Sequence, residues 1–205
     1  MDNERNRFLH VGCGTAYKDR TTPCFASDAW DEVRLDILPE VRPDILSTIV
    51  TLDGVDDASF DAVFSSHNIE HLYPYEVPQA LASFYRVLRD GGHLVITCPD
   101  LQSACEPIAA GRLLEPLYMS PSGPVSPLDM LYGFRPSLQA GSHAMAHRCG
   151  FVLDVLRQEL HNAGFDMVWS ARDTANFVLT AVAVKRIDAE ERLLELVAAH
   201  FPAPA

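Results

Sequence analysis

Hydrophobic positions along the chain gather in short runs that are separated by amphipathic or turn-rich stretches. Seven such runs predict strands, at residues 8–11, 32–37, 43–49, 60–65, 92–97, 167–171 and 176–185. Continuous apolar runs are typical of strands buried in a parallel sheet, and their alternation with helical segments indicates strand–helix–strand units. The pattern predicts a single α/β domain over residues 1–205, with a doubly wound, mainly parallel seven-stranded sheet.

A helix is predicted over residues 76–90. Its apolar side chains, among them Leu81, Phe84 and Leu88, recur at the intervals of three and four that place them on one helical face. The sequence Asp90-Gly91-Gly92 follows, and it predicts a glycine C-cap that leads directly into the next strand.

The C-terminal part of the chain predicts two more helices around two strands. Residues 151–163 carry an apolar stripe that ends at Gly164, and residues 188–200 form an amphipathic terminal helix before a disordered tail. A short turn around Asp173 joins the last two strands, so they form an antiparallel pair at the sheet edge. The sequence does not decide whether the apolar face of the terminal helix packs on the sheet or contacts a partner chain in a homodimer.

The segment 99–150 is irregular and rich in Pro, Gly and Ser, with short helical pieces expected at residues 108–114 and 128–132. Long irregular stretches inside a compact domain are commonly functional. Its aromatic and methionine content suits an adaptable apolar pocket. We therefore expect an insertion that covers a substrate; the alternative is an ordinary packed lid or a dimer surface.

Charge and composition exclude several classes of function. The chain has 16 Lys plus Arg against 28 Asp plus Glu, a formal charge of −12, which repels a phosphate backbone and argues against a nucleic-acid partner. The polar N-terminus lacks the apolar core of a signal peptide, and no run approaches the roughly 18 residues of a membrane helix. We expect a cytoplasmic protein with no membrane contact.

The cysteines point to core packing. There are five, an odd number, and no two are spaced as C-x-x-C, which argues against a disulfide framework and a cysteine-based zinc site. Cys13 lies between two glycines and has no base beside it in sequence, so we interpret it as a small side chain packed under a turn rather than a nucleophile.

The first candidate for chemistry is the sequence Gly12-Cys13-Gly14, which directly follows the first predicted strand, together with Asp36, which closes the second. Glycines let the backbone turn sharply and approach a ligand, and an acid about twenty residues on accepts hydrogen bonds from ribose hydroxyls. The pair indicates a nucleotide-cofactor site, although two glycines also serve any tight strand-to-helix turn.

Four motifs, taken in order, resemble the class I S-adenosylmethionine-dependent methyltransferases, in the small bacterial type with a Glu-His pair after the fourth strand. They occupy residues 9–14, 33–37, 59–72 and 85–96, and the pair is Glu70-His71. The resemblance runs over residues 8 to about 100 and 150 to 185. It implies a Rossmann-like methyltransferase fold, S-adenosylmethionine as cofactor, and methyl transfer to an oxygen or nitrogen of a small-molecule acceptor.

The resemblance also implies the cofactor-binding residues, which are Gly12, Cys13, Gly14, Asp36, Ile37, Thr48, Ser65, Ser66 and His67. The chain departs from its relatives at three places. His10 and Thr15 replace an acid and a small residue, and Thr48 stands where an acid usually approaches the adenine amino group. A weaker adenine contact is therefore expected.

Histidines supply the candidate catalytic groups. In a helix after the fourth strand, His67 would share a face with Glu70 or His71, and His143 and His147 would join them if the insertion folds over the strand edge. Some relatives bind a divalent metal through a Glu-x-x-Glu-His motif, which this chain matches in part. Acid–base use is favoured over a metal, because imidazole titrates near neutral pH; the candidate bases are His71, His67 and His147, in that order.

Two other functions stay open at this stage. The chain could be a catalytically silent cofactor-binding or interaction protein on the same fold. An NAD-dependent oxidoreductase is disfavoured, because the glycine loop lacks a third glycine. Titration with S-adenosylmethionine tests the first alternative, because a chain that does not bind this cofactor cannot be the enzyme.

Overall fold

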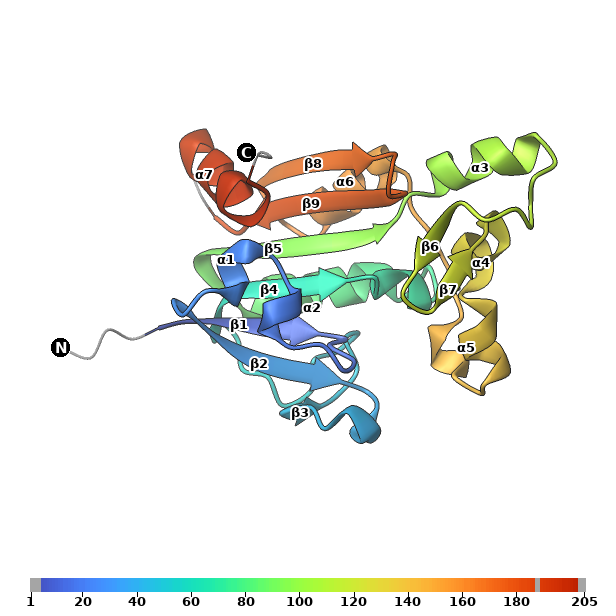
Figure 1. Ribbon diagram of the computed structural model, residues 1–205. Helices are drawn as coiled ribbons and strands as arrows, with labels where there is room; N and C mark the ends of the chain where they lie inside the picture. The colour runs from blue at the N-terminus through green and yellow to red at the C-terminus, as the bar shows by residue number, and fades with distance from the viewer. Residues whose placement is uncertain (1–4, 187–188, 203–205) are drawn as a thin grey trace.

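The computed structural model describes residues 5–186 and 189–202. Its main sheet has seven strands in the order β3-β2-β1-β4-β5-β9-β8 (Figure 1), which confirms the predicted α/β class. The strands are β1 (Asn6–Val11), β2 (Trp30–Asp36), β3 (Ile45–Leu46), β4 (Phe60–Ser66), β5 (Leu88–Pro99), β8 (Met167–Asp173) and β9 (Val178–Val184).

Strand register brings the functional segments to one edge. β1 pairs in parallel with β2 and β4, so that Val11 lies opposite both Leu35 and Ser65. β4 pairs in parallel with β5, and Ser65 lies opposite Ile96. The carboxyl ends of these four strands therefore meet, which is where open α/β sheets bind ligands. β9 runs antiparallel to β5 and β8 antiparallel to β9, as predicted for the sheet edge.

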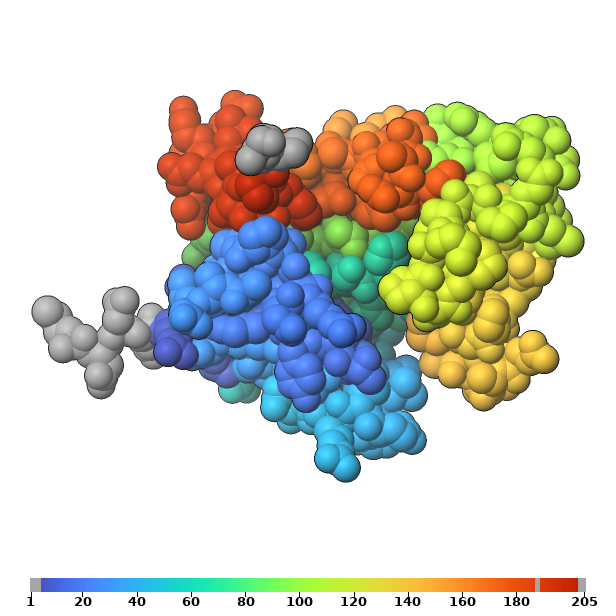
Figure 2. Space-filling model, viewed as in Figure 1, coloured from blue at the N-terminus to red at the C-terminus, as the bar shows by residue number. Residues whose placement is uncertain are grey.

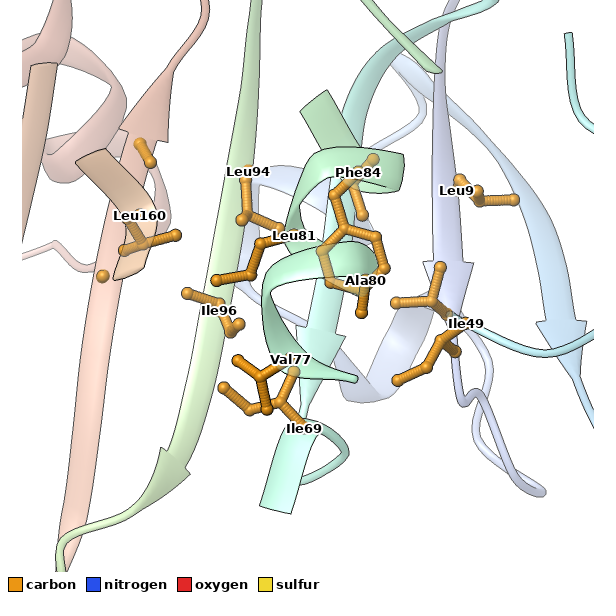
Figure 3. Close-up of a cluster of buried hydrophobic side chains, with 14 of the residues drawn as sticks. Leu9, Ile49, Ile69, Val77, Ala80, Leu81, Phe84, Leu94, Ile96 and Leu160 are labelled. Atoms are coloured by element: carbon orange, nitrogen blue, oxygen red, sulfur yellow. The ribbon is translucent and has the colours of Figure 1, made fainter. Parts of the chain in front are cut away.

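Helices cover both faces of the sheet and bury a separate apolar cluster on each. On one face, α2 (Val77–Val87) and α6 (Leu153–Asn162) pack through Leu81, Phe84 and Leu160 (Figure 3). Each such side chain contributes about 1.5–3 kcal/mol when fully buried. On the other face, the four-residue α1 (Pro23–Ala26) and α7 (Glu190–His200) enclose Phe25 and Leu196.

The terminal helix α7 packs on the sheet. Leu193 and Leu196 are buried against β8, β9 and α1. Of the two arrangements that the sequence left open, packing on the sheet is therefore the one observed. His200, in the last turn of α7, reaches the sheet strand β5, where its Nε2 lies 2.9 Å from Nε2 of His93. The predicted helix start at residue 188 and the tail residues 203–205 lie outside the described residues.

The predicted end of the helix over 76–90 is wrong. α2 ends at Val87, and Leu88 already belongs to β5. The backbone at Gly91 and Gly92 is engaged by the neighbouring chain, because Gly91 N donates to Lys185 O and Lys185 N donates to Gly92 O. Asp90-Gly91-Gly92 therefore lies inside an irregular strand start, where the register to β4 shifts, and is no helix cap.

The insertion after β5 is more ordered than its sequence suggests. It contains α3 (Leu101–Ala109), the hairpin β6 (Tyr118–Ser120) and β7 (Gly123–Val125), α4 (Pro127–Tyr132) and α5 (Arg135–Gln139). The helix expected at 108–114 is misplaced: Asp100 caps the first turn by accepting from Gln102 N, so the helix starts there. The piece expected at 128–132 corresponds to α4.

The insertion stands over the carboxyl edge of the sheet (Figure 1). In the space-filling view, a gap in the surface separates it from the loops after β2 and β3 (Figure 2). Within the described part of the chain, no helix combines the length and the apolar character needed to cross a bilayer.

Candidate active site

A cavity of about 340 Å³ opens at the carboxyl ends of β1, β2 and β4. Its wall combines a glycine turn, an acid and an apolar side. It is lined by Gly12, Gly14, Asp36, Ile37, Leu38, Thr48, Ile49, Val50, His67, Asn68, His71, Leu72, Glu76, Ala144, Met145 and Arg148. We call it the first cavity.

The glycine turn needs glycine at Gly12. Its φ is +60°, a conformation that L side chains rarely adopt, and a Cβ built there would clash with the side-chain amide of Asn68. Gly14 also has a positive φ, of +52°, but faces open space. Asn68 Nδ2 is buried and has no hydrogen-bond partner within the described residues, so an unused donor lies in the cavity wall beside Gly12.

Asp36 is buried and clamps the turn. Its Oδ2 accepts from Gly14 N at 2.8 Å, and its Oδ1 accepts from Leu38 N at 3.0 Å. An ionised carboxylate has about four lone-pair sites, so both oxygens keep the capacity to accept from ligand hydroxyls. The same side chain thus shapes the loop and lines the first cavity.

Arg34 is a structural residue that the sequence analysis missed. It is buried on β2, its guanidinium donates to Gly14 O and Ala16 O, and it lies 4.2 Å from the centre of the Tyr17 ring. It therefore fixes the loop after β1 from below. The available signal was a single charge inside an apolar run, Val33-Arg34-Leu35.

Of the residues that the resemblance assigns to the cofactor, six line the first cavity: Gly12, Gly14, Asp36, Ile37, Thr48 and His67. Three lie outside this wall. Cys13 is buried under the turn, Ser66 shares a hydrogen bond of 2.9 Å with the Thr97 hydroxyl, and Ser65 Oγ is buried with no partner among the described residues.

The Cys13 thiol is held in its neutral form. Burial raises its pKa to about 11, against an ordinary value of 9.0. A thiol with that pKa is protonated near neutral pH and is a poor nucleophile, in keeping with a packing role.

A second cavity, of about 290 Å³, adjoins the first and is walled largely by the insertion. His67, His71 and Met145 line both cavities. The other residues of the second cavity are Glu70, Pro99, Tyr118, Ser120, Ser122, Val125, Asp129, Met130, Phe134, Ser137, His147 and Phe177.

The segment after β4 is a tight turn where the sequence predicted a helix. His67 has φ +48°, and only Ile69–His71 form a short 3-10 helix. The predicted helical face shared by His67 and Glu70 is therefore wrong. His67 is half-exposed, and its Nδ1 lies 3.6 Å from Oε1 of Glu70.

Glu70 is almost fully enclosed, at 1 % exposure, and its Oε2 has no hydrogen-bond partner in the described chain. Burial by itself raises the pKa of its carboxyl. The hydrogen bond and charge of His67, with the charge of His71, outweigh burial and bring the pKa below its ordinary value. The side chain is therefore a buried carboxylate.

Two histidines meet over this carboxylate. His71 Nδ1 donates to Ala146 O at 3.2 Å and His147 Nδ1 donates to Met130 O at 2.8 Å, a tautomer assignment that follows from the carbonyl acceptors. Their ring centres are 5.0 Å apart. Burial lowers the pKa of His147, so its ring is neutral near pH 7. His143 is exposed and lines neither cavity.

The fold and site together have the form of an open α/β sheet with a glycine turn and an acid at the carboxyl ends of its strands, which is where such sheets bind nucleotide cofactors. Residues 9–96 match the family model described as a methyltransferase domain. The match covers residues 9–96 of 205, and with the strand order it makes the chain similar to the class I S-adenosylmethionine-dependent methyltransferases, whose cofactor is S-adenosylmethionine.

Solved structures share the fold at low sequence identity. A S-adenosylmethionine-dependent methyltransferase of Methanosarcina mazei is 18% identical with a TM-score of 0.57, over 90% of this chain and 94% of that one. The 1,6-didemethyltoxoflavin-N1-methyltransferase of Burkholderia thailandensis, with bound 1,6-didemethyltoxoflavin and S-adenosylhomocysteine, is 16% identical with a TM-score of 0.55, over 88% and 71%.

Phosphoethanolamine N-methyltransferase 2 of Haemonchus contortus, in complex with S-adenosyl-L-methionine, is 14% identical with a TM-score of 0.57, over 88% of this chain and 49% of that one. Among curated proteins, a search by sequence found no match.

The first cavity fits the cofactor of this class. Asp36 offers free lone pairs for ribose hydroxyls, and Asn68 Nδ2 offers a buried donor without a partner. Ile37, Leu38, Ile49 and Val50 give an apolar side for a purine ring. Thr48 Oγ1 accepts from Val50 N at 3.2 Å and so holds its own loop in place.

Proposed function

We propose that this protein transfers a methyl group to an oxygen or nitrogen atom of a small molecule held in the second cavity. The observation that carries the proposal is that the two cavities adjoin and share His67, His71 and Met145. Ligands in adjoining pockets can be held in line at near-contact distance, which is the main requirement of a displacement reaction.

Bound S-adenosylmethionine supplies an electrophilic methyl group on a sulfonium. We propose that seven residues of the first cavity hold this cofactor: Gly12, Gly14, Asp36, Ile37, Thr48, His67 and Asn68. For Cys13, Ser65 and Ser66, the proposed part is to shape the loops under the cofactor, because their side chains lie outside the cavity wall.

The histidines are the proposed proton acceptors. An acceptor hydroxyl or ammonium group must give up its proton, and a neutral imidazole nitrogen takes it. His71 ranks first, because it lines both cavities and its Nδ1 bond to Ala146 O leaves Nε2 free for the proton. His67 also lines both cavities but is half-exposed, and His147 lines the second alone.

The second cavity favours an uncharged or cationic acceptor with an apolar part. Neither lysine nor arginine is among the described residues of its wall, whereas Tyr118, Met130, Phe134 and Phe177 supply apolar surface. The Asp129 carboxylate is paired with Arg135, with an Nε to Oδ1 distance of 2.8 Å. The volume of about 290 Å³ suits a small molecule. The insertion would thus cover the acceptor.

The cytoplasm is the proposed location. All five cysteines are free thiols, as a reducing compartment requires. The formal charge of −12 supports an acceptor other than nucleic acid.

Two measurements test the proposal. Calorimetry with S-adenosylmethionine and S-adenosylhomocysteine should show binding. Radiolabelled methyl transfer should then be screened with hydroxylated and amine-bearing aromatic acceptors, against matched carboxylates and phosphates. No binding of either cofactor form would exclude the enzyme. Binding with no transfer to any acceptor would favour the catalytically silent protein on the same fold.

A further inference from the structure

Three side chains with metal-ligating atoms meet in the wall of the second cavity. They are Glu70, His71 and His147, and their ligand atoms all lie within 4.8 Å of one another. Two come from the turn after β4 and the third from the end of the insertion. The fold, rather than a local motif, therefore brings the three together.

The carboxylate of this cluster lacks a partner. Glu70 is 1 % exposed, and Oε2 makes no hydrogen bond within the described residues, while Oε1 is 3.6 Å from His67 Nδ1. A buried charged oxygen without a partner carries a desolvation cost, and such groups are normally paired or bound to a metal. The orphaned oxygen is the independent sign that a cation is missing from this cluster.

The imidazoles are oriented as ligands. His71 and His147 both donate Nδ1–H to backbone carbonyl oxygens, of Ala146 and Met130 respectively. A histidine that binds a metal almost always donates its other ring nitrogen in this way, which fixes the tautomer and turns the free nitrogen toward the ion. Both carbonyls belong to the insertion, so its folding aims both rings.

We propose that Glu70, His71 and His147 bind a divalent first-row transition metal ion, with the remaining coordination positions open to the second cavity. Two imidazoles and one carboxylate form a donor set that suits such ions and leaves room for water or an acceptor oxygen. Only the idea that an acceptor oxygen reaches the ion rests on the proposed function. The metal site itself does not require methyl transfer. Nε2 of His71 cannot bind an ion and accept a proton at once, so a bound ion would take the place of the proton-acceptor role proposed above for His71 and His147.

Binding would draw the three side chains together. A tetrahedral ion with bonds of about 2.0–2.1 Å separates its ligands by roughly 3.3 Å. The cluster spans up to 4.8 Å, so small side-chain rotations must close the difference. His71 and His147 should therefore show shifted imidazole resonances on titration with zinc.

The experiment uses the full chain, purified without a histidine tag and stripped with a chelator. Cobalt(II) chloride is added without cofactor or acceptor, and visible absorption and calorimetry are recorded. We expect one ion per chain, with the d–d bands of a four- or five-coordinate site, and displacement by zinc. An absorption spectrum equal to that of cobalt in buffer would overturn the proposal.

Variants locate the ion. Glu70→Gln keeps the shape of the carboxyl group, and His147→Ala removes one ring. Each should weaken cobalt binding by more than the 10–100-fold that loss of an outer hydrogen-bond partner typically costs. His143→Ala, an exposed histidine of the same insertion, is the matched control and should bind as the parent chain does. Parent-like binding by both cluster variants would overturn the proposal.

Circular dichroism spectra show whether each variant is folded. Because the two variants alter different segments, the test still gives a result if one of them unfolds. Calorimetry with S-adenosylmethionine on the same samples separates the two proposals. Cofactor binding without cobalt binding removes the metal site and leaves the histidines as proton acceptors. Cobalt binding without cofactor binding would overturn the proposed methyl transfer and support the metal site.

Discussion

The Asp36 carboxylate, at the end of β2, accepts a hydrogen bond of 2.8 Å from the backbone N–H of Gly14, in the loop that follows β1. The acid proposed to hold the ribose therefore also holds the shape of the glycine turn. Cofactor affinity and loop geometry depend on one side chain.

Replacing Asp36 by Asn tests this double role. The amide has one acceptor oxygen, so either Gly14 N or Leu38 N loses its partner, at a cost of about 1–3 kcal/mol, and the ribose loses a charged acceptor. We expect affinity for S-adenosylmethionine, measured by calorimetry, to fall at least about tenfold. Asp28→Asn, at an exposed position, should leave affinity unchanged. Equal affinity in Asp36→Asn would remove the acid from the cofactor site.

The glycine turn allows a matched pair of substitutions. Gly12→Ala meets a positive φ and a contact with Asn68, whereas Gly54→Ala meets a positive φ of +80° in open space. Both should lose about 1–2 kcal/mol through backbone strain, seen as a lower Tm. Gly12→Ala alone should also lose cofactor binding, and Asn68→Ala added to it should restore part of the Tm. If the two glycine variants bind cofactor equally, close packing at Gly12 is irrelevant to the site.

His71→Ala should keep cofactor binding and lose turnover. His71 lies where the cavities meet, and removal of a positioned proton acceptor typically costs about 10²–10⁴-fold in rate. The measurement is kcat with an acceptor from the screen, beside calorimetry with S-adenosylmethionine, and His143→Ala serves as the control. An undiminished rate in His71→Ala would discard the role.

Acid should destabilise the protein through the His93 and His200 pair. Burial lowers the pKa of His93 to about 3 and that of His200 to about 4, from an ordinary value of 6.5. Both histidines are therefore neutral when folded and take up protons on unfolding. Their contribution to stability is complete above pH 6.5 and is lost as the pH falls toward 4 and 3. The groups facing them are Phe25, the Thr22 hydroxyl and the charge of Arg192.

The check is thermal unfolding of the wild type and of His200→Phe between pH 7.5 and 4. His200→Phe should lower Tm at pH 7.5, because it removes the 2.6 Å bond to Thr22 Oγ1, but should show a smaller loss of Tm on acidification. His143→Asn, which changes an exposed histidine, should keep the wild-type slope. A slope in His200→Phe as steep as in the wild type would exclude the pair as the source.

Strand positions could be read from the sequence because the central strands are largely buried and so are rich in apolar residues, as in Phe8-Leu9-His10-Val11, whereas the outer strands β3 and β8 are only partly buried. The glycine turn and Asp36 were also predictable, because each lies at the end of such a run. The shape of the His67 turn was not, since a left-handed residue other than glycine leaves no mark in hydrophobic spacing.

The histidine cluster was predictable only in part. His67, Glu70 and His71 are neighbours in sequence, but the choice between His143 and His147 depends on tertiary contacts. His147 is held by Met130 O in α4, whereas His143 faces solvent. Arg34 was missed because a buried charge is satisfied by backbone carbonyls from several loops, among them Gly14 O and Arg42 O.

The first cavity is lined by residues up to Glu76 and by Ala144, Met145 and Arg148 of the insertion, whereas the second is lined mostly by later parts of the chain. The family match ends at residue 96, and apart from His67, Glu70 and His71 every residue lining the second cavity lies at or beyond Pro99. Rewriting residues 101–150 should therefore change the proposed acceptor while Gly12, Gly14 and Asp36 stay unaltered, provided that Ala144, Met145 and Arg148 are kept, because these three also line the first cavity. Such a swap must also retain His147, the Met130 carbonyl that aims it and the Ala146 carbonyl that aims His71.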